Sequence, residues 1–260
     1  MNGEGEGRLD RIREEIRTRL DPDFDWVRPG PLPWTPAPAD PRGARVALLT
    51  TGGLHLRGDR PFRAGKDPLG DTGFRLVPHG ATRRELRLDA PYVDQRWAAR
   101  DPEVALPMRA LERLHREGVT GAPAPRHVSF ASGIARPLPG LEESAARLLP
   151  LLREDGAGSV VLLPTCSLCV QSVALLARFL EAGGIPTVTI TMLPELTRLV
   201  GAPRALAVRF PFGAPCGDPG NRDLQRAVLR EALDLLAAAR EPGTIVPSRH
   251  SWRRPPAPRS

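Results

Sequence analysis

Short apolar runs alternate with segments of helical periodicity over most of the chain. The first run covers residues 45–51 and ends at a pair of glycines, the pattern of a buried strand followed by a tight turn. Similar runs predict further strands, at 74–77, 127–131, 159–164, 187–192 and 205–210. Apolar positions three and four apart predict helices at 106–117, 141–153, 170–182 and 224–240. This alternation predicts an α/β fold, a single domain built on a doubly wound, mainly parallel sheet.

The first forty residues follow a different pattern. Apolar side chains at helical spacing predict a short amphipathic helix that has to dock on the main domain or on another subunit; they are Leu9, Ile12, Ile16 and Leu20. The proline-rich run at 28–41 excludes helix and sheet, because proline lacks a backbone N–H and favours extended geometry in the residue before it. We expect an extended strap there, with Trp26 and Trp34 as anchors.

These patterns divide the chain into three parts. Residues 1–42 hold the N-terminal helix and the proline-rich strap, and residues 43–247 form the α/β domain. Residues 248–260 form a basic tail, which we expect to be unstructured because arginine and proline dominate it.

The charge of the chain carries less information than its size suggests. The 260 residues have a formal net charge of +7, yet Lys66 is the single lysine among the 37 basic residues. Four of the arginines fall within the basic tail. The charge therefore reflects a bias toward arginine and a basic tail, and we expect no nucleic acid partner.

The sequence also bears on the compartment. The charged N-terminal segment lacks the apolar run of a secretory signal, and no apolar stretch reaches the length of a membrane span. Three cysteines are an odd number for a secreted disulfide scaffold. We therefore expect a cytoplasmic protein without a membrane partner.

The most informative motif is the cysteine pair Cys166 and Cys169, which follows the predicted strand at 159–164 and opens the next helix. A helix N-terminus stabilises an anion, so the pKa of the Cys166 thiol should be lowered toward the nucleophilic thiolate. Cys169 lies close enough to attack a mixed disulfide on Cys166. Two thiols at this spacing are also found as half of a zinc site, which would need Cys216 and scattered histidines, or as plain core residues.

Other candidates lie where predicted strands end, because ligands of parallel α/β folds bind beyond the carboxyl ends of the strands. His55 follows the first strand, where a general acid or a hydrogen-bond donor to substrate would be useful. Gly52 and Gly53 would let a ligand approach the backbone, or would form a tight structural turn.

Several segments of the chain resemble those of one known protein family. The segments VALLTTGGLH at 46–55 and VVLLPTCSLC at 160–169 resemble the selenoprotein B family of glycine, sarcosine, betaine and D-proline reductases, in particular the small selenocysteine subunit of D-proline reductases. Further similar segments follow in the same order along the chain, at 59–62, 70–78, 184–190, 201–205 and 243–247. The resemblance extends from the strap to Pro247.

The resemblance implies a dithiol-dependent reductase that cleaves a carbon–nitrogen bond next to a carboxylate. Cys166 would stand at the position of the selenocysteine nucleophile, and Cys169 would resolve the adduct. Asp94, Thr165 and Arg204 become candidate substrate-binding residues, and Arg204 could hold a carboxylate with two hydrogen bonds.

The family also implies partners. We expect an amino acid or a derivative as substrate, a dithiol or thioredoxin-like protein as electron donor, a partner reductase subunit, and a homo-oligomer as a further option. The D-proline reaction uses a pyruvoyl group on a separate chain. We therefore expect no cofactor in this chain. We also expect no metal, because a zinc site would need Cys216 and scattered histidines.

Three departures separate this chain from the family pattern. Sulfur replaces selenium at Cys166, the segment 88–94 lacks a histidine that relatives tend to carry, and Cys216 adds a third thiol. Because a carbon–sulfur bond is cleaved less readily than a carbon–selenium bond, we expect a substrate that is easier to reduce. The alternative is a non-catalytic thiol redox or metal-binding protein on the same scaffold.

Overall fold

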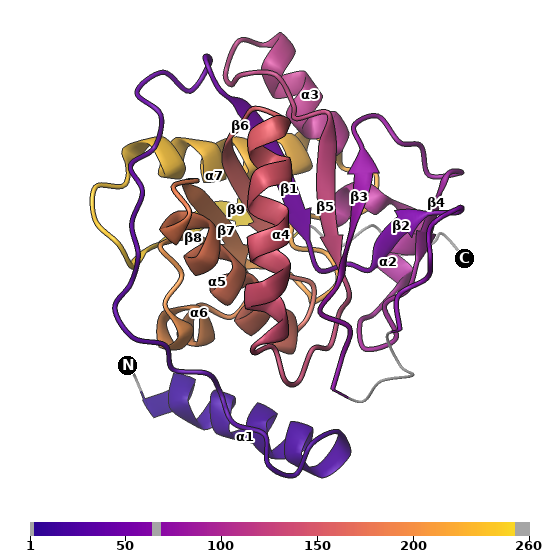
Figure 1. Ribbon diagram of the computed structural model, residues 1–260, viewed down its shortest axis with the longest axis vertical. Coiled ribbons are helices and arrows are strands. Elements are labelled where there is room, and N and C mark those ends of the chain that lie inside the picture. The colour runs from indigo at the N-terminus through magenta and orange to yellow at the C-terminus, as the bar shows by residue number, and fades with distance from the viewer. Residues whose placement is uncertain (1–2, 64–68, 253–260) are drawn as a thin grey trace.

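The computed structural model describes residues 3–63 and 69–252, and its centre is a seven-stranded sheet (Figure 1). The strand order is β3-β5-β1-β6-β7-β8-β9, and only the pair β3 and β5 is antiparallel. The strands are β1 (Arg45–Thr50), β3 (Phe74–Pro78), β5 (Arg126–Phe130), β6 (Ala157–Leu163), β7 (Thr187–Thr191), β8 (Arg204–Arg209) and β9 (Thr244–Ser251). A separate small sheet pairs β2 (Leu54–Leu56) with β4 (Leu86–Leu88).

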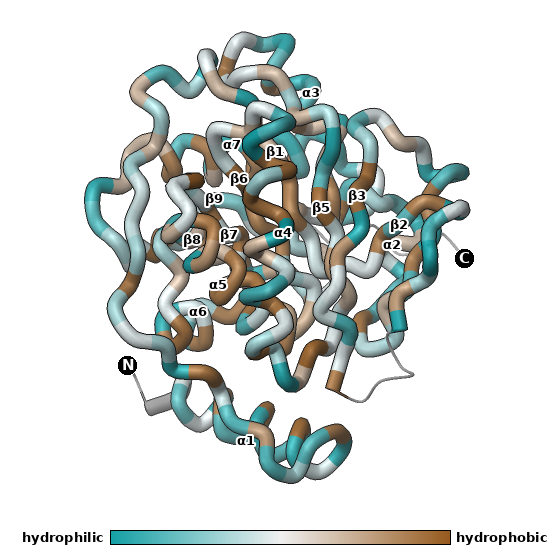
Figure 2. Tube along the Cα trace, in the orientation of Figure 1, coloured by the Kyte–Doolittle hydropathy of each residue, from teal (hydrophilic) through white to brown (hydrophobic). Residues whose placement is uncertain are grey.

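Helices cover both faces of the central sheet. On one face lie α3 (Met108–Arg116) and α7 (Arg222–Ala238), and on the other lie α4 (Gly140–Glu154) and α5 (Ser167–Ala182). Successive residues of β1 alternate between the two cores, with Leu48 in one and Leu49 in the other. Hydrophobic residues accordingly concentrate along the central strands (Figure 2). The predicted α/β fold with a mainly parallel sheet in a single domain is confirmed.

Three short helices complete the fold: α2 (Arg96–Arg100), the 3₁₀ turn η1 (Pro102–Val104) and α6 (Pro194–Val200). The sequence pattern predicted neither these helices nor the small sheet, because each of these elements is too short for its apolar residues to show a helical or strand period. Within the described residues, no helix is long and apolar enough to cross a membrane.

The chain leaves β1 toward β5 on one side, whereas it leaves β6 toward β7 on the other side. The carboxyl ends of β1 and β6 therefore border the point where the direction of winding changes, and a crevice forms at such a point in doubly wound folds. The two ends are joined by a hydrogen bond of 3.3 Å from the Thr51 N–H to the Leu163 carbonyl. The cysteine pair follows β6 here.

The N-terminal helix α1 (Gly3–Arg19) lies along the lower edge of the molecule in Figure 1, where it contacts α6. Its buried side chains Leu9 and Ile16 belong to the same apolar cluster as the start of α5. The apolar face predicted from the sequence thus docks on the main domain.

The strap after α1 has the expected extended path and is fastened to α5 by polar side chains. The Gln171 side chain accepts a hydrogen bond from the Val27 N–H at 2.7 Å, and Arg178 donates to the Gly30 and Pro31 carbonyls at 2.8 and 2.7 Å. These contacts satisfy backbone groups that a proline-rich segment cannot pair within a sheet.

The C-terminal boundary differs from the prediction. β9 continues to Ser251, so residues 248–251 belong to a strand and not to an unstructured tail. Glu231 of α7 accepts hydrogen bonds from the Ser248 hydroxyl and from the Arg249 N–H, and Ser251 pairs with Arg209. The strand is at the edge of the sheet and mostly polar, so no apolar run marks it. Residues 253–260 of the predicted tail lie outside the described residues.

Candidate active site

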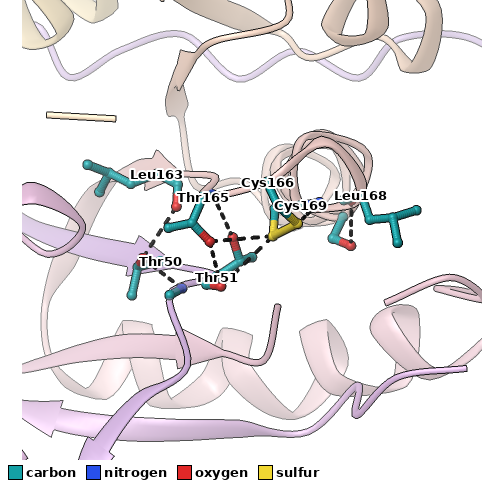
Figure 3. The surroundings of a disulfide bond; sticks show 9 residues. Thr50, Thr51, Leu163, Thr165, Cys166, Leu168 and Cys169 are labelled. Atoms are coloured by element: carbon teal, nitrogen blue, oxygen red, sulfur yellow. Dashed lines mark hydrogen bonds between the residues drawn. A yellow bond between two sulfur atoms is a disulfide. The ribbon is translucent and has the colours of Figure 1, made fainter. Parts of the chain in front are cut away.

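Cys166 is the N-cap of α5 and lies three residues beyond the end of β6. Its backbone is extended, with φ −142° and ψ 178°, and its sulfur accepts a hydrogen bond of 3.1 Å from the Cys169 N–H. The two cysteines form a disulfide with a Cα–Cα distance of 4.8 Å (Figure 3). The sequence pattern of strand, turn and helix thus places both sulfurs beyond the carboxyl ends of β1 and β6.

The two sulfurs have different surroundings. The Cys166 sulfur faces a backbone N–H at the positive end of a 16-residue helix, which stabilises a negative charge. The Cys169 sulfur lies 3.5 Å from the Thr165 hydroxyl oxygen and 4.0 Å from the Thr51 carbonyl oxygen. Because the Thr165 hydroxyl donates to the Thr51 carbonyl at 2.9 Å, both oxygens can accept from a Cys169 S–H (Figure 3). After reduction, this arrangement favours a thiolate at Cys166 and a thiol at Cys169.

A cavity of about 470 Å³ leads to Cys166. It lies between the second half of α1, the loop at residues 91–93 and the start of α5. Its walls are mainly apolar, with one ion pair of 2.8 Å between Glu15 and Arg19. Cys166 is 7% exposed and Cys169 only 1%, so Cys166 is the sulfur that a molecule in this cavity meets.

A second hollow, of about 380 Å³, lies beside α3. It is lined by arginines and by Asp101 and Glu103, and the residues predicted for the site are not among those that line it. Its chemistry is separate from that of the cysteines.

Thr165 is the predicted residue that the structure brings next to the cysteines. Gly52 and Gly53 also lie at the end of β1, but their close contacts are within the chain. The Gly52 N–H donates to the Thr50 hydroxyl at 3.1 Å. Gly53 has φ +66°, and a Cβ atom there would lie 2.1 Å from the Asp89 carbonyl oxygen. These two glycines therefore form a tight structural turn.

His55 is buried in the small sheet away from this cavity. Its Nε2 lies 2.9 Å from the Asp89 carboxylate, and its Nδ1 donates to the Leu56 carbonyl at 2.7 Å. Phe62 packs edge-on against the ring. Both ring nitrogens are thus used within the chain, and the structure does not bring His55 together with the cysteines.

Asp94 follows the loop that lines the cavity and forms an ion pair of 2.6 Å with Arg96. Arg204 lies at the opposite end of the parallel strands. It is the first residue of β8, whereas the cysteines follow the last residue of β6. It is fully buried, pairs with Glu181 and donates to the Thr35 carbonyl at 2.6 Å. Arg204 fastens the strap, and this placement does not support a role as a carboxylate clamp at the cysteines.

Cys216 is fully buried in a different apolar cluster, where its thiol donates to the Gln225 carbonyl at 3.4 Å. Burial raises the pKa of this thiol, as do the nearby carboxylates Glu103 and Asp101. Among the described residues, no three or more His, Cys, Asp or Glu side chains are grouped so that they could hold a metal ion. Cys216 therefore does not join the cysteine pair.

Sequence reasoning missed the residues of α1 and of the loop at 91–93 that complete the cavity. Ile12, Ile16 and Arg19 belong to the predicted amphipathic helix, but periodicity shows only that one face docks and not where. Tyr92 and Val93 lie in a segment whose apolar residues follow neither a helical nor a strand period, so no pattern marked them. Thr51 was part of the predicted first strand, and its contact with Cys169 depends on the pairing of β1 with β6.

The chain is similar in sequence to subunits of known reductases. D-proline reductase subunit gamma of Acetoanaerobium sticklandii is 31% identical over 221 residues, which are 85% of this chain and 89% of the relative. Sarcosine reductase complex component B subunit beta of Peptoclostridium acidaminophilum is 26% identical over 242 residues, 86% of this chain and 51% of the relative. Glycine reductase complex component B subunit gamma of the same organism is 27% identical over 251 residues, 89% of this chain and 53% of the relative.

The chain thus spans about half of the sarcosine and glycine reductase components and most of the D-proline reductase subunit. No family model and no solved structure matches the chain. All three relatives are parts of reductases, which supports an oxidoreductase-type role.

Proposed function

The chain belongs to the family of D-proline reductase gamma subunits and of the B components of glycine and sarcosine reductases, and from this premise we propose that it is a dithiol-dependent reductase. Cys166 is the nucleophile and Cys169 the resolving thiol. The substrate is a small amino acid or a derivative with an activated carbon–nitrogen bond or a related bond next to a carboxylate.

The proposed reaction has three steps. The Cys166 thiolate attacks the substrate carbon, a carbon–sulfur bond forms, and the amine leaves with its electron pair and takes up a proton. Cys169, after losing its proton, then attacks the Cys166 sulfur; the carbon–sulfur bond breaks, the carbanion takes up a proton, and the disulfide forms. A dithiol donor finally reduces the disulfide and is itself oxidised.

The observation that supports this proposal is the difference between the two sulfurs. Cys166 accepts an N–H bond at the start of α5 and borders the cavity, whereas Cys169 is buried beside two oxygen acceptors. A nucleophile needs access and a stabilised thiolate, and a resolving thiol needs only to reach the nucleophile. Activation of the leaving amine, which a pyruvoyl group supplies in the D-proline reaction, is assigned in this proposal to a partner subunit.

The test uses the variant Cys169→Ser, in which the second step cannot occur. We expect the reduced variant, incubated with a panel of amino acids and N-methylated or ring-bearing derivatives, to accumulate a covalent adduct on Cys166. The wild-type protein with dithiothreitol should instead release the reduced product. Mass spectrometry of the intact chain and of the peptide that carries Cys166 measures both outcomes.

Cys166→Ser is the matched control and should give neither adduct nor product, because the serine hydroxyl is not ionised at neutral pH. The panel includes quaternary ammonium derivatives, whose amine leaves without activation by a partner subunit. Absence of adduct and product across this panel would contradict reductive cleavage. If the disulfide of the wild-type protein still exchanged with dithiothreitol in that case, the alternative of a non-catalytic thiol redox protein would be favoured.

A further inference from the structure

Two histidines away from the cysteines link the central strand β1 to the surface of α3. The Leu48 N–H of β1 donates to the His127 Nδ1 at 3.1 Å, beside the backbone pairing of β1 with β5. The His127 Nε2 lies 2.9 Å from the His79 Nδ1. The His79 Nε2 lies 3.3 Å from the Glu112 carboxylate of α3. The side chains of His127, His79 and Glu112 thus form one hydrogen-bonded chain, the histidine chain.

The positions of the ring protons follow from the backbone donor. A backbone amide can only donate, so the His127 Nδ1 has to accept and carries no proton. Neutral His127 therefore has its proton on Nε2 and donates it to the His79 Nδ1. His79 in turn has its proton on Nε2 and donates it to Glu112. All the N–H groups point in one direction, from β1 toward α3.

Neither ring of this chain has room for a further proton. On His79 the proton would bind Nδ1, which faces the N–H of His127. On His127 it would bind Nδ1, which faces the Leu48 N–H. His127 is also fully buried, and this burial, together with the neighbouring His79, lowers its pKa to about 3. Burial lowers the pKa of His79 as well, although the hydrogen bond to Glu112 opposes the shift.

His79 is the ring that can move. Its side chain is 22% exposed and lines a hollow of about 430 Å³ beside α3, which Glu112 also lines. A charged His79 ring can therefore turn away from His127 and keep a carboxylate partner. The charged side chains that line this hollow around His79 come from the 3₁₀ turn η1 and from α3, and they are Glu103, Arg109, Glu112, Arg113 and Arg116.

We propose that His79 is a pH-sensitive latch that joins β1 and β5 to α3. Neutral His79 accepts from His127 and keeps the histidine chain closed. Protonated His79 leaves His127 and turns into the hollow, so that the buried His127 N–H loses its acceptor. Because folding favours the neutral ring, the free energy of unfolding falls as the pH drops below about 6.5, where histidines of the unfolded chain take up a proton. The latch does not depend on the chemistry of the cysteines.

The first experiment follows the ring nitrogens of the ¹⁵N-labelled wild-type protein by NMR from about pH 7.5 to about pH 5. At the upper pH we expect both rings to be neutral with the proton on Nε2, and the His127 N–H to exchange slowly with water. His79 should take up its proton with a midpoint below about 6.5. The His127 N–H signal should disappear at the same midpoint, while His127 stays neutral.

His115→Asn is the control, because the His115 Nδ1 contacts the Thr120 carbonyl and the ring does not line this hollow. This variant should keep the His127 signal and its pH dependence. A proton on the His79 Nδ1 at neutral pH would overturn the latch, as would a His127 signal that persists after His79 has become charged. A His79 ring that stays neutral until the protein unfolds would overturn it too.

The second experiment uses His79→Asn, which offers His127 an amide oxygen as acceptor and takes up no proton. Between about pH 7.5 and about pH 5.5, the folding equilibrium constant of wild type should fall by up to about tenfold more than that of the variant. Urea unfolding at both pH values measures the two constants. Equal pH dependence of wild type and His79→Asn would overturn the latch. Should the variant fail to fold, the NMR titration of wild type decides the question.

Discussion

Thr165 links the cysteine pair to the ends of two strands. Its hydroxyl donates to the Thr51 carbonyl, its N–H donates to the Thr51 hydroxyl at 3.3 Å, and its carbonyl accepts from the Gly213 N–H at 2.8 Å. The hydroxyl also lies beside the Cys169 sulfur. Thr165 thus joins the cysteine pair to the hydrogen bonding at the ends of β1 and β6.

Thr165→Val keeps the shape of the side chain and removes this hydroxyl. In the oxidised protein the buried Thr51 carbonyl then loses its donor, and we expect a loss of about 1–3 kcal/mol in the free energy of unfolding. In the reduced protein the loss should be smaller, because the Cys169 S–H can donate to the same carbonyl. Urea unfolding with and without reductant measures both values.

Thr165→Ser retains the hydroxyl and serves as the control, with the loss of a single methyl group as its only change. Equal destabilisation of the oxidised and reduced forms by Thr165→Val would show that Cys169 does not take over the bond to Thr51.

Among the helices and strands, α5 has two structural roles. Its first residues carry the disulfide, and its last turns hold the strap through Arg178 and Glu181. Glu181 accepts from the Thr35 N–H and from Arg204, each at 2.5 Å, and both charged side chains are fully buried. Burial raises the pKa of Glu181, which Arg204 opposes. The Arg204 guanidinium also lies 3.5 Å above the Trp34 ring.

Arg204→Met removes the cation and leaves the Glu181 charge buried without its partner. We expect a loss of about 3–5 kcal/mol in the free energy of unfolding, the range measured when one partner of a buried ion pair is removed. The strap should also become more sensitive to proteolysis, since Arg204 holds the Thr35 carbonyl. Denaturant unfolding and limited proteolysis are the measurements.

Arg209→Met changes the same residue type at the exposed end of the same strand. It should lower the free energy of unfolding by about 0.5 kcal/mol or less. Comparable losses for the two variants would contradict a structural role for Arg204. A specific loss at Arg204 with the Cys166 reactivity unchanged would separate the strap from the site.

The elements differ in how far their sequence determines them. The buried strands and long helices were predicted because their apolar residues recur at the period of one element. β9 was not predicted, because its residues are mostly polar and are held by Glu231 of α7, a contact between distant segments. Arg204 became a site candidate through the family resemblance, although the strand predicted at 205–210 already placed it at the start of a strand and the cysteines after the end of another.

At the scale of the whole molecule, the cysteine pair could be located from the sequence, because strand, turn and helix follow one another locally. The cavity could not, since it joins α1, the loop at 91–93 and α5 across more than a hundred residues. Family resemblance pointed to Cys166 as the proposed nucleophile but not to the residues around it. The sequence therefore predicts the reactive atoms, and the packing determines what reaches them.

One buried carboxyl group, that of Glu103, makes the stability of the whole molecule depend on pH. Glu103 is 7% exposed, and its carboxylate accepts from the Arg109 N–H at 2.8 Å. Burial, with a smaller contribution from the neighbouring Asp101, raises the pKa of this carboxyl to about 7, although the hydrogen bond from the Arg109 N–H opposes the shift. Between its ordinary value and about 7, the folded protein keeps a proton that the unfolded chain has lost, so the free energy of unfolding falls as pH rises.

Glu103→Gln removes this titration and keeps an acceptor for the Arg109 N–H. We expect the variant to match wild type at about pH 4 and to exceed it by about 3 kcal/mol above pH 7, which is the energy of the difference between the two pKa values. Urea unfolding across this range measures the slope, and Glu143→Gln on the exposed side of α4 is the control. A Glu103→Gln variant whose stability depends on pH as wild type does would mean that Glu103 is charged in the folded protein at neutral pH, and the Glu103 carboxylate would then be a fixed charge beside Cys216.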